Sequence, residues 1–71
     1  MRGEELVRKV KRLGDRRSIS VSFRPERGKG SHGTLHFGER RATIPDLKKE
    51  LKSGTLGAIL RQLGLSHSEL V

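Results

Sequence analysis

Several residue types are missing from this chain, and each absence removes a class of protein. None of its 71 residues is cysteine, which excludes a disulfide framework and a thiolate zinc site. Tryptophan and tyrosine are also absent, and the aromatic residues Phe23 and Phe37 are assigned to the core. No segment approaches the roughly 20 apolar residues of a transmembrane helix, and the first residues lack the apolar run of a signal peptide. We therefore expect a cytoplasmic protein that does not contact a membrane.

The length of the chain predicts one domain, residues 1–71. A domain of this size buries only about 60% of the surface that its unfolded chain exposes. Hydrophobic residues make up 31% of the chain, and the core is expected to consist mainly of Leu, Val and Ile. Such a core has no room for an enclosed cofactor pocket on the order of several hundred Å³. We therefore expect no cofactor, and any chemistry must take place on an open surface.

Charge is strongly biased toward one sign. Sixteen Lys and Arg stand against eight Asp and Glu, which gives a net charge of +8. This balance favours partners rich in negative charge, such as nucleic acid, an acidic membrane surface or an acidic protein. A basic surface also keeps a small protein soluble, but so high a charge density on a short chain favours nucleic acid. Because aromatic residues for base stacking are lacking, recognition of RNA through its backbone and shape is favoured.

Two amphipathic segments are predicted to form helices. Apolar residues three and four positions apart run through residues 4–13, and Gly14 follows as a C-terminal stop. The same period runs through residues 53–63, and Gly64 closes that helix. Residues 66–69 have the S-x-x-E form of a capping box, which predicts a short final turn.

Between the two helices the apolar residues alternate with polar ones, as in strands with one buried face. The predicted strands are residues 18–23, about 32–37, and 40–45, and they form an antiparallel meander. Both helices are expected to cover the apolar face, giving an α+β fold with the order α-β-β-β-α. The opposite face is expected to be polar and open to a ligand. Its predicted residues are Ser18, Ser20, Ser22, His32, Thr34, His36, Arg41 and Thr43.

His32 is the strongest candidate for a catalytic residue. Strand parity puts it on the open face, and Gly30 and Gly33 let a backbone approach it. Histidine can take the proton of a ribose 2′-hydroxyl or give one to a leaving 5′-oxygen. His36 lies about 13 Å along a straight strand, too far to act on the same phosphate. The alternative is that His32 is a surface histidine beside a glycine turn.

Basic and polar residues outside the core are candidate RNA contacts. Their alternative explanation is that they are solvated positions in loops and on helix faces. Those that we expect to contact RNA, mainly through its phosphates, are Arg27, Lys29, Ser31, Lys48, Lys49 and Lys52. The histidines do not have the spacing of metal ligands, and we expect no metal site.

Three segments in this order form a specific combination. Glu4-Glu5-Leu6-Val7 opens a basic helix, Gly30-Ser31-His32 leads into a strand, and residues 50–65 contain Ser53-Gly54-Thr55-Leu56 at a helix start. Together they resemble the HicA-type toxins of bacterial and archaeal toxin–antitoxin systems of type II. The resemblance implies an α-β-β-β-α fold similar to double-stranded-RNA-binding domains. It also implies an mRNA interferase, an endoribonuclease that cleaves messenger RNA independently of the ribosome.

The resemblance also implies roles for a residue and a partner. The histidine of the family's glycine-serine-histidine segment is catalytic, and it corresponds to His32. A HicB-type antitoxin neutralises the toxin by binding over that site, and the free chain is expected to be a monomer. The stretch from Gly14 to Gly30 is longer than usual for the family, and Asp46 and Leu47 stand where a further histidine is often found. Two other functions stay open: a non-catalytic module that binds double-stranded RNA, and a basic subunit that only pairs with an acidic protein.

Overall fold

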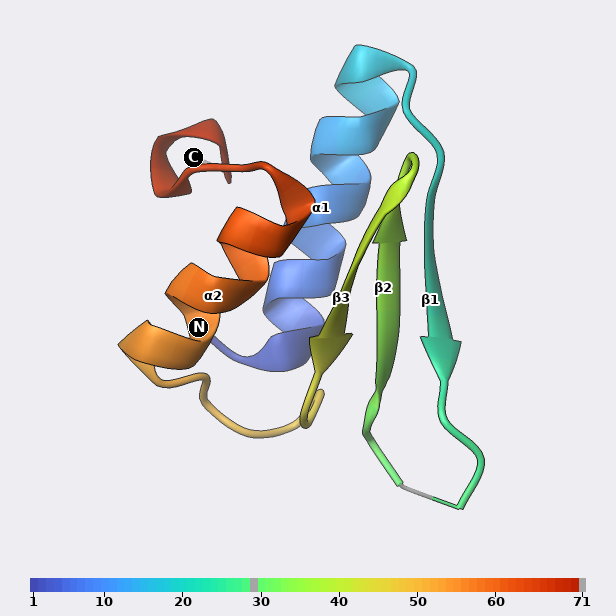
Figure 1. Ribbon diagram of the computed structural model, residues 1–71, viewed down its shortest axis with the longest axis vertical. Coiled ribbons are helices and arrows are strands. Elements are labelled where there is room, and N and C mark those ends of the chain that lie inside the picture. The colour runs from blue at the N-terminus through green and yellow to red at the C-terminus, as the bar shows by residue number, and fades with distance from the viewer. Residues whose placement is uncertain (29, 71) are drawn as a thin grey trace.

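The computed structural model describes residues 1–28 and 30–70. Along the chain, a long helix is followed by three strands, a shorter helix and a final 3-10 turn (Figure 1). The predicted order α-β-β-β-α is therefore confirmed. The elements are α1 (Gly3–Arg17), β1 (Val21–Pro25), β2 (Gly33–Phe37), β3 (Arg40–Ile44), α2 (Ser53–Leu63) and η1 (His67–Leu70).

The three strands form one antiparallel sheet in the order β1-β2-β3, as the alternation predicts. Leu35 in the middle strand pairs with Phe23 on one side and with Ala42 on the other. The turn between β2 and β3 contains only Gly38 and Glu39, and Gly38 has φ 60°, a conformation that favours glycine. The register therefore puts the apolar residues of all three strands on one face.

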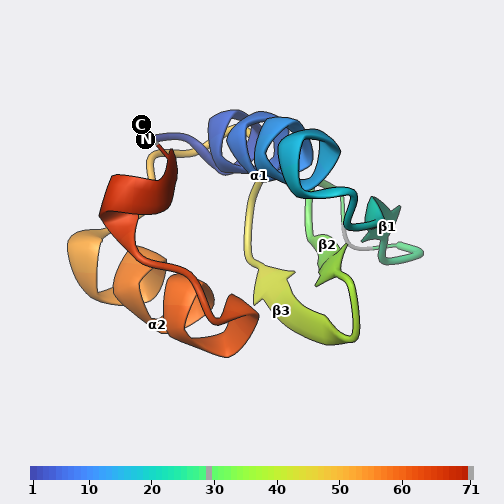
Figure 2. The same ribbon diagram turned by 90° about the horizontal axis from the view of Figure 1, so that it is seen from above.

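Both helices lie on that apolar face of the sheet (Figure 2). α1 packs against β1 and β2, whereas α2 packs against β3. The buried core residues are Leu6, Val7, Val10, Leu13, Leu35, Phe37, Ala42, Ile44, Leu51, Leu56, Ile59, Leu60, Leu63, Leu65 and Leu70. Ile19, Val21 and Phe23, which the alternation assigns to the core, are only partly buried because β1 is an edge strand on the side away from α2. Within residues 1–28 and 30–70, no helix has the length and apolar character needed to cross a membrane.

α1 is longer than predicted, because Gly14 does not end it. The helix continues to Arg17, and Ser18 at φ 56° forms the C-cap. Gly14 is buried instead, and an added Cβ would lie 2.7 Å from the carbonyl oxygen of Ile19 and would clash with the side chain of Val21. The glycine therefore allows the chain to fold back closely against the helix.

β1 consequently begins and ends later than predicted. The chain is still leaving α1 at Ile19, whose N–H donates to the carbonyl of Gly14 at 2.8 Å. Ser18 and Ser20, which the alternation predicts on the open face of the sheet, therefore lie outside β1. Arg24 lies in the strand instead, and its partner in β2 is Thr34.

The C-terminal turn is capped as the sequence predicts. The N–H and the hydroxyl of Ser66 donate to Glu69 Oε1 at 2.8 and 3.0 Å. On the other carboxylate oxygen, Arg17 Nη2 lies at 2.7 Å and ties η1 to the end of α1. The hydrogen bond from Arg17, followed by those from Ser66, holds the pKa of Glu69 below its ordinary value of 4.5.

Replacing Gly14 by alanine should destabilise the protein, although Ala is the better helix former. The added methyl group meets backbone at Ile19, so the free energy of unfolding should fall by about 1–3 kcal/mol. Gly57 in α2 has no atom within 4 Å of an added Cβ and is the matched control. Gly57→Ala should raise the free energy of unfolding by about 0.5–1 kcal/mol. Urea unfolding measures both, and equal stabilisation by the two substitutions would contradict the packing described for Gly14.

The carboxylate of Glu69 should contribute to stability in a pH-dependent way. Because its pKa is lowered in the folded state, its contribution is present above the unfolded pKa and is lost as the pH falls through the folded pKa. Glu69→Gln should therefore lower the melting temperature slightly at about pH 7, and this difference should be smaller at about pH 3. Thermal unfolding of both proteins at the two pH values tests this, and a difference that did not change with pH would argue against it.

Candidate functional site

His32 is the last residue of the connection between β1 and β2. The N–H of Glu26 donates to the carbonyl of His32 at 2.8 Å, one step beyond the last strand pair, Pro25 and Gly33. His32 therefore lies just before β2. The strand begins at Gly33, one residue later than predicted. Its side chain is 31% exposed.

The imidazole of His32 lies against a carboxylate. Nδ1 is 3.0 Å from Oε2 of Glu26, and this nitrogen is shielded from solvent. The separation is within ion-pair range, but the carboxylate lies off the direction of an N–H bond on the ring, so the contact is not a hydrogen bond. The two side chains are therefore close but not aligned, with Nδ1 as the ring nitrogen turned away from solvent.

The connection between β3 and α2 passes beside the same end of the sheet. The N–H of Leu47 donates to the carbonyl of Ser31 at 3.1 Å, and its carbonyl accepts from the N–H of Glu4 at 2.8 Å. Leu47 thus joins the residue before His32 to the first turn of α1. Lys48 follows directly, and its own N–H donates to Asp46 Oδ1 at 2.8 Å.

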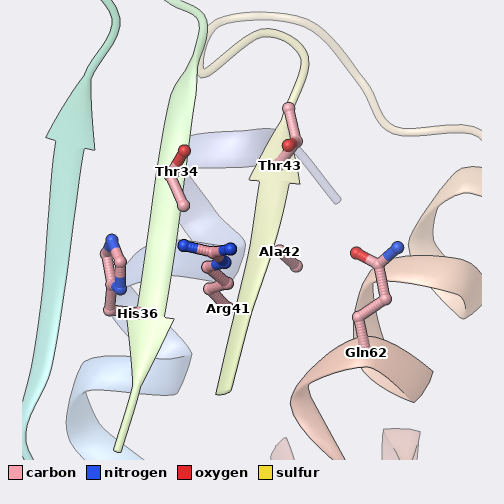
Figure 3. Close-up of a pocket in the computed structure, with 6 residues that line it drawn as sticks. All are labelled: Thr34, His36, Arg41, Ala42, Thr43 and Gln62. Atoms are coloured by element: carbon pink, nitrogen blue, oxygen red, sulfur yellow. The ribbon is translucent and has the colours of Figure 1, made fainter. Parts of the chain in front are cut away.

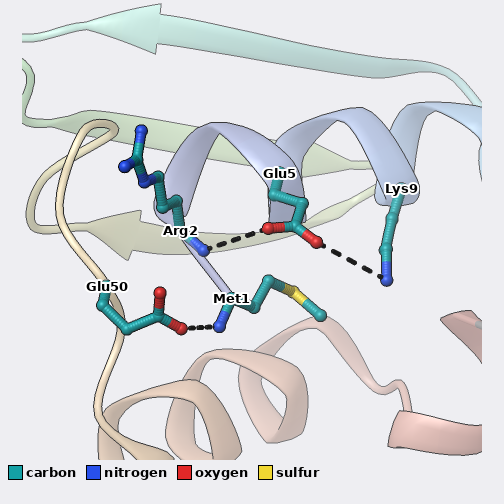
Figure 4. A network of polar contacts seen from close by, with 5 residues as sticks. All are labelled: Met1, Arg2, Glu5, Lys9 and Glu50. Atoms are coloured by element: carbon teal, nitrogen blue, oxygen red, sulfur yellow. Dashed lines mark hydrogen bonds and ion pairs between the residues drawn. The ribbon is translucent and has the colours of Figure 1, made fainter.

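The first residues of the chain also contact the connection between β3 and α2. The carbonyl of Met1 accepts from the N–H of Leu51 at 2.9 Å, and the N–H of Gly3 donates to the carbonyl of Lys49 at 3.3 Å. The amino group of Met1 forms an ion pair with Glu50 (Figure 4). Residues 46–51 are therefore tied to α1 through several backbone contacts.

The structure brings together some of the predicted site residues. Ser31 and His32 lie beside the segment that carries Lys48 and Lys49, because Leu47 contacts Ser31. Lys52 is the N-cap of α2. The predicted contacts with exposed side chains are Arg27, Lys48, Lys49 and Lys52, whereas Ser31 is partly buried. Lys29 lies outside the described residues.

A separate hollow lies on the open face of the sheet. It has a volume of about 600 Å³ and is lined by Thr34, His36, Arg41, Ala42, Thr43 and Gln62. Figure 3 shows His36 on β2 beside Arg41 on β3, with Gln62 of α2 on the other side of β3, next to Ala42. None of these residues is acidic, and His32 is not among them. The predicted open face therefore exists, but its hollow is lined by His36 and Arg41 and not by His32.

Glu26 was not among the predicted site residues. Its place beside His32 depends on the hairpin register, in which Phe23 pairs with Leu35 and Pro25 with Gly33. Matching the two apolar patterns across the loop would have placed Glu26 opposite His32, since paired residues of antiparallel strands lie on one face. Within residues 1–28 and 30–70, no group of three or more histidine, cysteine or carboxylate side chains is placed to bind a metal ion.

One comparison with known proteins identifies the family of the chain. The family model described as the HicA toxin of bacterial toxin–antitoxin systems matches residues 3–65. Neither the curated proteins nor the solved structures contain a match to the chain. The matched range includes both helices, the whole sheet and the His32 segment. The chain therefore belongs to the HicA toxin family.

Proposed function

We propose that this protein is an endoribonuclease that cleaves messenger RNA, with His32 as its catalytic residue and without a metal ion. Membership of the HicA family makes it a toxin of a toxin–antitoxin system, with nuclease activity, an RNA substrate and an antitoxin partner. The observation that supports His32 is its position. Its partly exposed imidazole lies at one end of the sheet, beside the connection that carries Lys48 and Lys49.

The proposed chemistry uses a nucleophile that RNA itself supplies. The 2′-hydroxyl oxygen attacks the adjacent phosphorus, and the bond between phosphorus and the 5′-oxygen breaks. His32 takes the proton of the 2′-hydroxyl or gives one to the leaving 5′-oxygen. Arg27 and Lys29 are the proposed phosphate contacts, whose positive charges would stabilise the charge that develops on the phosphorane.

RNA binding rests on the basic surface of the chain. A net charge of +8 favours contacts with phosphates along an RNA strand. Lys48 and Lys49 are exposed, and the hydrogen bond between Leu47 and Ser31 holds their segment beside His32. We therefore propose that these lysines contact phosphates close to the scissile bond, together with Lys52 at the start of α2.

A HicB-type antitoxin is the proposed partner. Because the residues around His32 belong to an open loop and a neighbouring connection, a protein bound there would exclude RNA from the imidazole. Such an antitoxin should compete with RNA for binding.

Replacing His32 by alanine should abolish RNA cleavage and growth arrest. General acid–base catalysis contributes on the order of 10²- to 10⁴-fold, so the cleavage rate of the purified variant should fall by at least about 100-fold. His36→Ala is the matched control, since His36 lies on the open face and lines a different hollow. It should retain the parent rate. Cleavage of a labelled RNA, with circular dichroism to confirm folding, measures both effects.

The same cleavage measurements distinguish the proposed endoribonuclease from a non-catalytic RNA-binding module. If His32→Ala cut RNA at the parent rate, His32 would not be catalytic. If the parent itself bound duplex RNA but left it intact, with affinity falling steeply with salt, the chain would be a non-catalytic RNA-binding module.

Removing the charges of Lys48 and Lys49 should weaken RNA binding without abolishing catalysis. The slope of log affinity against log salt becomes shallower by about 1 for every lysine that no longer binds a phosphate. The variant with Lys48→Gln and Lys49→Gln should therefore show a slope lower by up to about 2 and a raised KM. Arg61→Gln removes an exposed charge at the opposite end of α2 and should leave the slope unchanged. Equal slopes for all three proteins would exclude binding of these lysines to RNA.

A further inference from the structure

We propose that Glu26 is a positioning residue for His32, holding the imidazole with Nδ1 turned inward and Nε2 presented to the RNA. The inference rests on the proposed role of His32 and adds the group that assists it. Within residues 1–28 and 30–70, Glu26 is the carboxylate in contact with this histidine.

Two contacts link these residues, and each supports the other. The backbone hydrogen bond of 2.8 Å from Glu26 to His32 sets the two residues opposite each other across the hairpin. Opposed residues of antiparallel strands have Cβ atoms about 4.5–5.5 Å apart, a distance that their side chains readily bridge. The pairing of the backbone therefore brings the two side chains within reach of each other, and Oε2 lies 3.0 Å from Nδ1. A surface side chain that met the ring by chance would lack this constraint.

The burial of Nδ1 decides which ring nitrogen faces Glu26. Nδ1 is shielded from solvent, although 31% of the side chain is exposed. A shielded N–H without an aligned acceptor is unfavourable, and the carboxylate of Glu26 is the acceptor that lies beside it. Catalytic hydrogen bonds are often poorly aligned before substrate binds and tighten in the complex. We infer that a small rotation of the ring or of the carboxylate completes this bond when RNA binds.

The arrangement assigns a direction to proton transfer. A carboxylate that accepts Nδ1–H keeps the proton of the neutral ring on that nitrogen, so Nε2 carries the lone pair. Nε2 then takes the proton of the 2′-hydroxyl as the bond between the 2′-oxygen and phosphorus forms. The bond from phosphorus to the 5′-oxygen breaks, and the 5′-oxygen takes a proton from water. Glu26 remains ionised and stabilises the imidazolium that is produced.

Steady-state cleavage of a defined RNA by purified variants tests the role of Glu26. Glu26→Gln keeps the size of the side chain but removes its charge, and it should lower kcat by about 100-fold while leaving KM unchanged. Glu26→Asp keeps the carboxylate and should recover part of that loss. Glu39→Gln removes the same charge at the opposite end of the β2 strand and should behave as the parent. Parent kcat in Glu26→Gln would overturn the proposal.

A double variant separates positioning from a general effect on folding. If Glu26 acts through His32, Glu26→Gln should lower the residual rate no further when His32→Ala is already present. An additional 100-fold loss in the double variant would show that Glu26 acts by another route and would overturn the proposal.

The tautomer of His32 provides a readout that does not depend on activity. The spectra are recorded in complex with an RNA that stays uncut because hydrogen replaces its reactive 2′-hydroxyl. At neutral pH, nitrogen-15 spectra of the ring should then show the proton on Nδ1 in the parent and a shift toward protonation at Nε2 in Glu26→Gln. An unchanged tautomer would overturn the positioning role. If His32→Ala were as active as the parent, the proposed function would fail, and these spectra would still decide whether Glu26 orients the ring. If His32→Ala were inactive and Glu26→Gln fully active, the proposed function would stand and only the role of Glu26 would be lost.

Discussion

The close approach of α1 to the segments that follow it is the constraint on which the rest of the fold depends. Two glycines make it possible, one at each end of the buried helix face. A Cβ on Gly3 would meet the backbone of Asp46, and a Cβ on Gly14 would meet the backbone of Ile19. The first approach draws the connection before α2 against the helix, and the second turns the chain into β1. Both therefore act on the position of the sheet and not on the helix alone.

Backbone hydrogen bonds connect this close approach to the end of the sheet at which the proposed catalytic residue, His32, lies. The first turn of α1 binds Leu47, Leu47 binds Ser31, and His32 pairs with Glu26 across the hairpin. Main-chain groups make every one of these links. The arrangement suits the proposed catalysis, which depends on one imidazole, one carboxylate and a basic surface.

The sequence was sufficient for the order of elements, since periods of 3.6 and 2 reflect which face each element buries. It was misleading at Gly14, because a helical glycine required by a tertiary contact looks the same as one that ends a helix. The edges of β1 depend on that contact, and so the place of Arg24 on the open face was missed. Glu26 was missed because its proximity to His32 depends on hairpin register. The importance of His32 was predicted from its segment, whereas its contacts required the structure.

The most direct measurement uses RNA with a single chemical change. A short RNA that the purified protein cuts at one position is prepared again with hydrogen in place of the 2′-hydroxyl next to the scissile phosphate, and both are incubated with excess EDTA. If His32 activates that hydroxyl without a metal ion, the parent RNA is cut, its 5′ product ends in a 2′,3′-cyclic phosphate, and the deoxy RNA stays intact at that position. Cleavage of the deoxy RNA at the same rate, or loss of all cleavage in EDTA, would contradict the account.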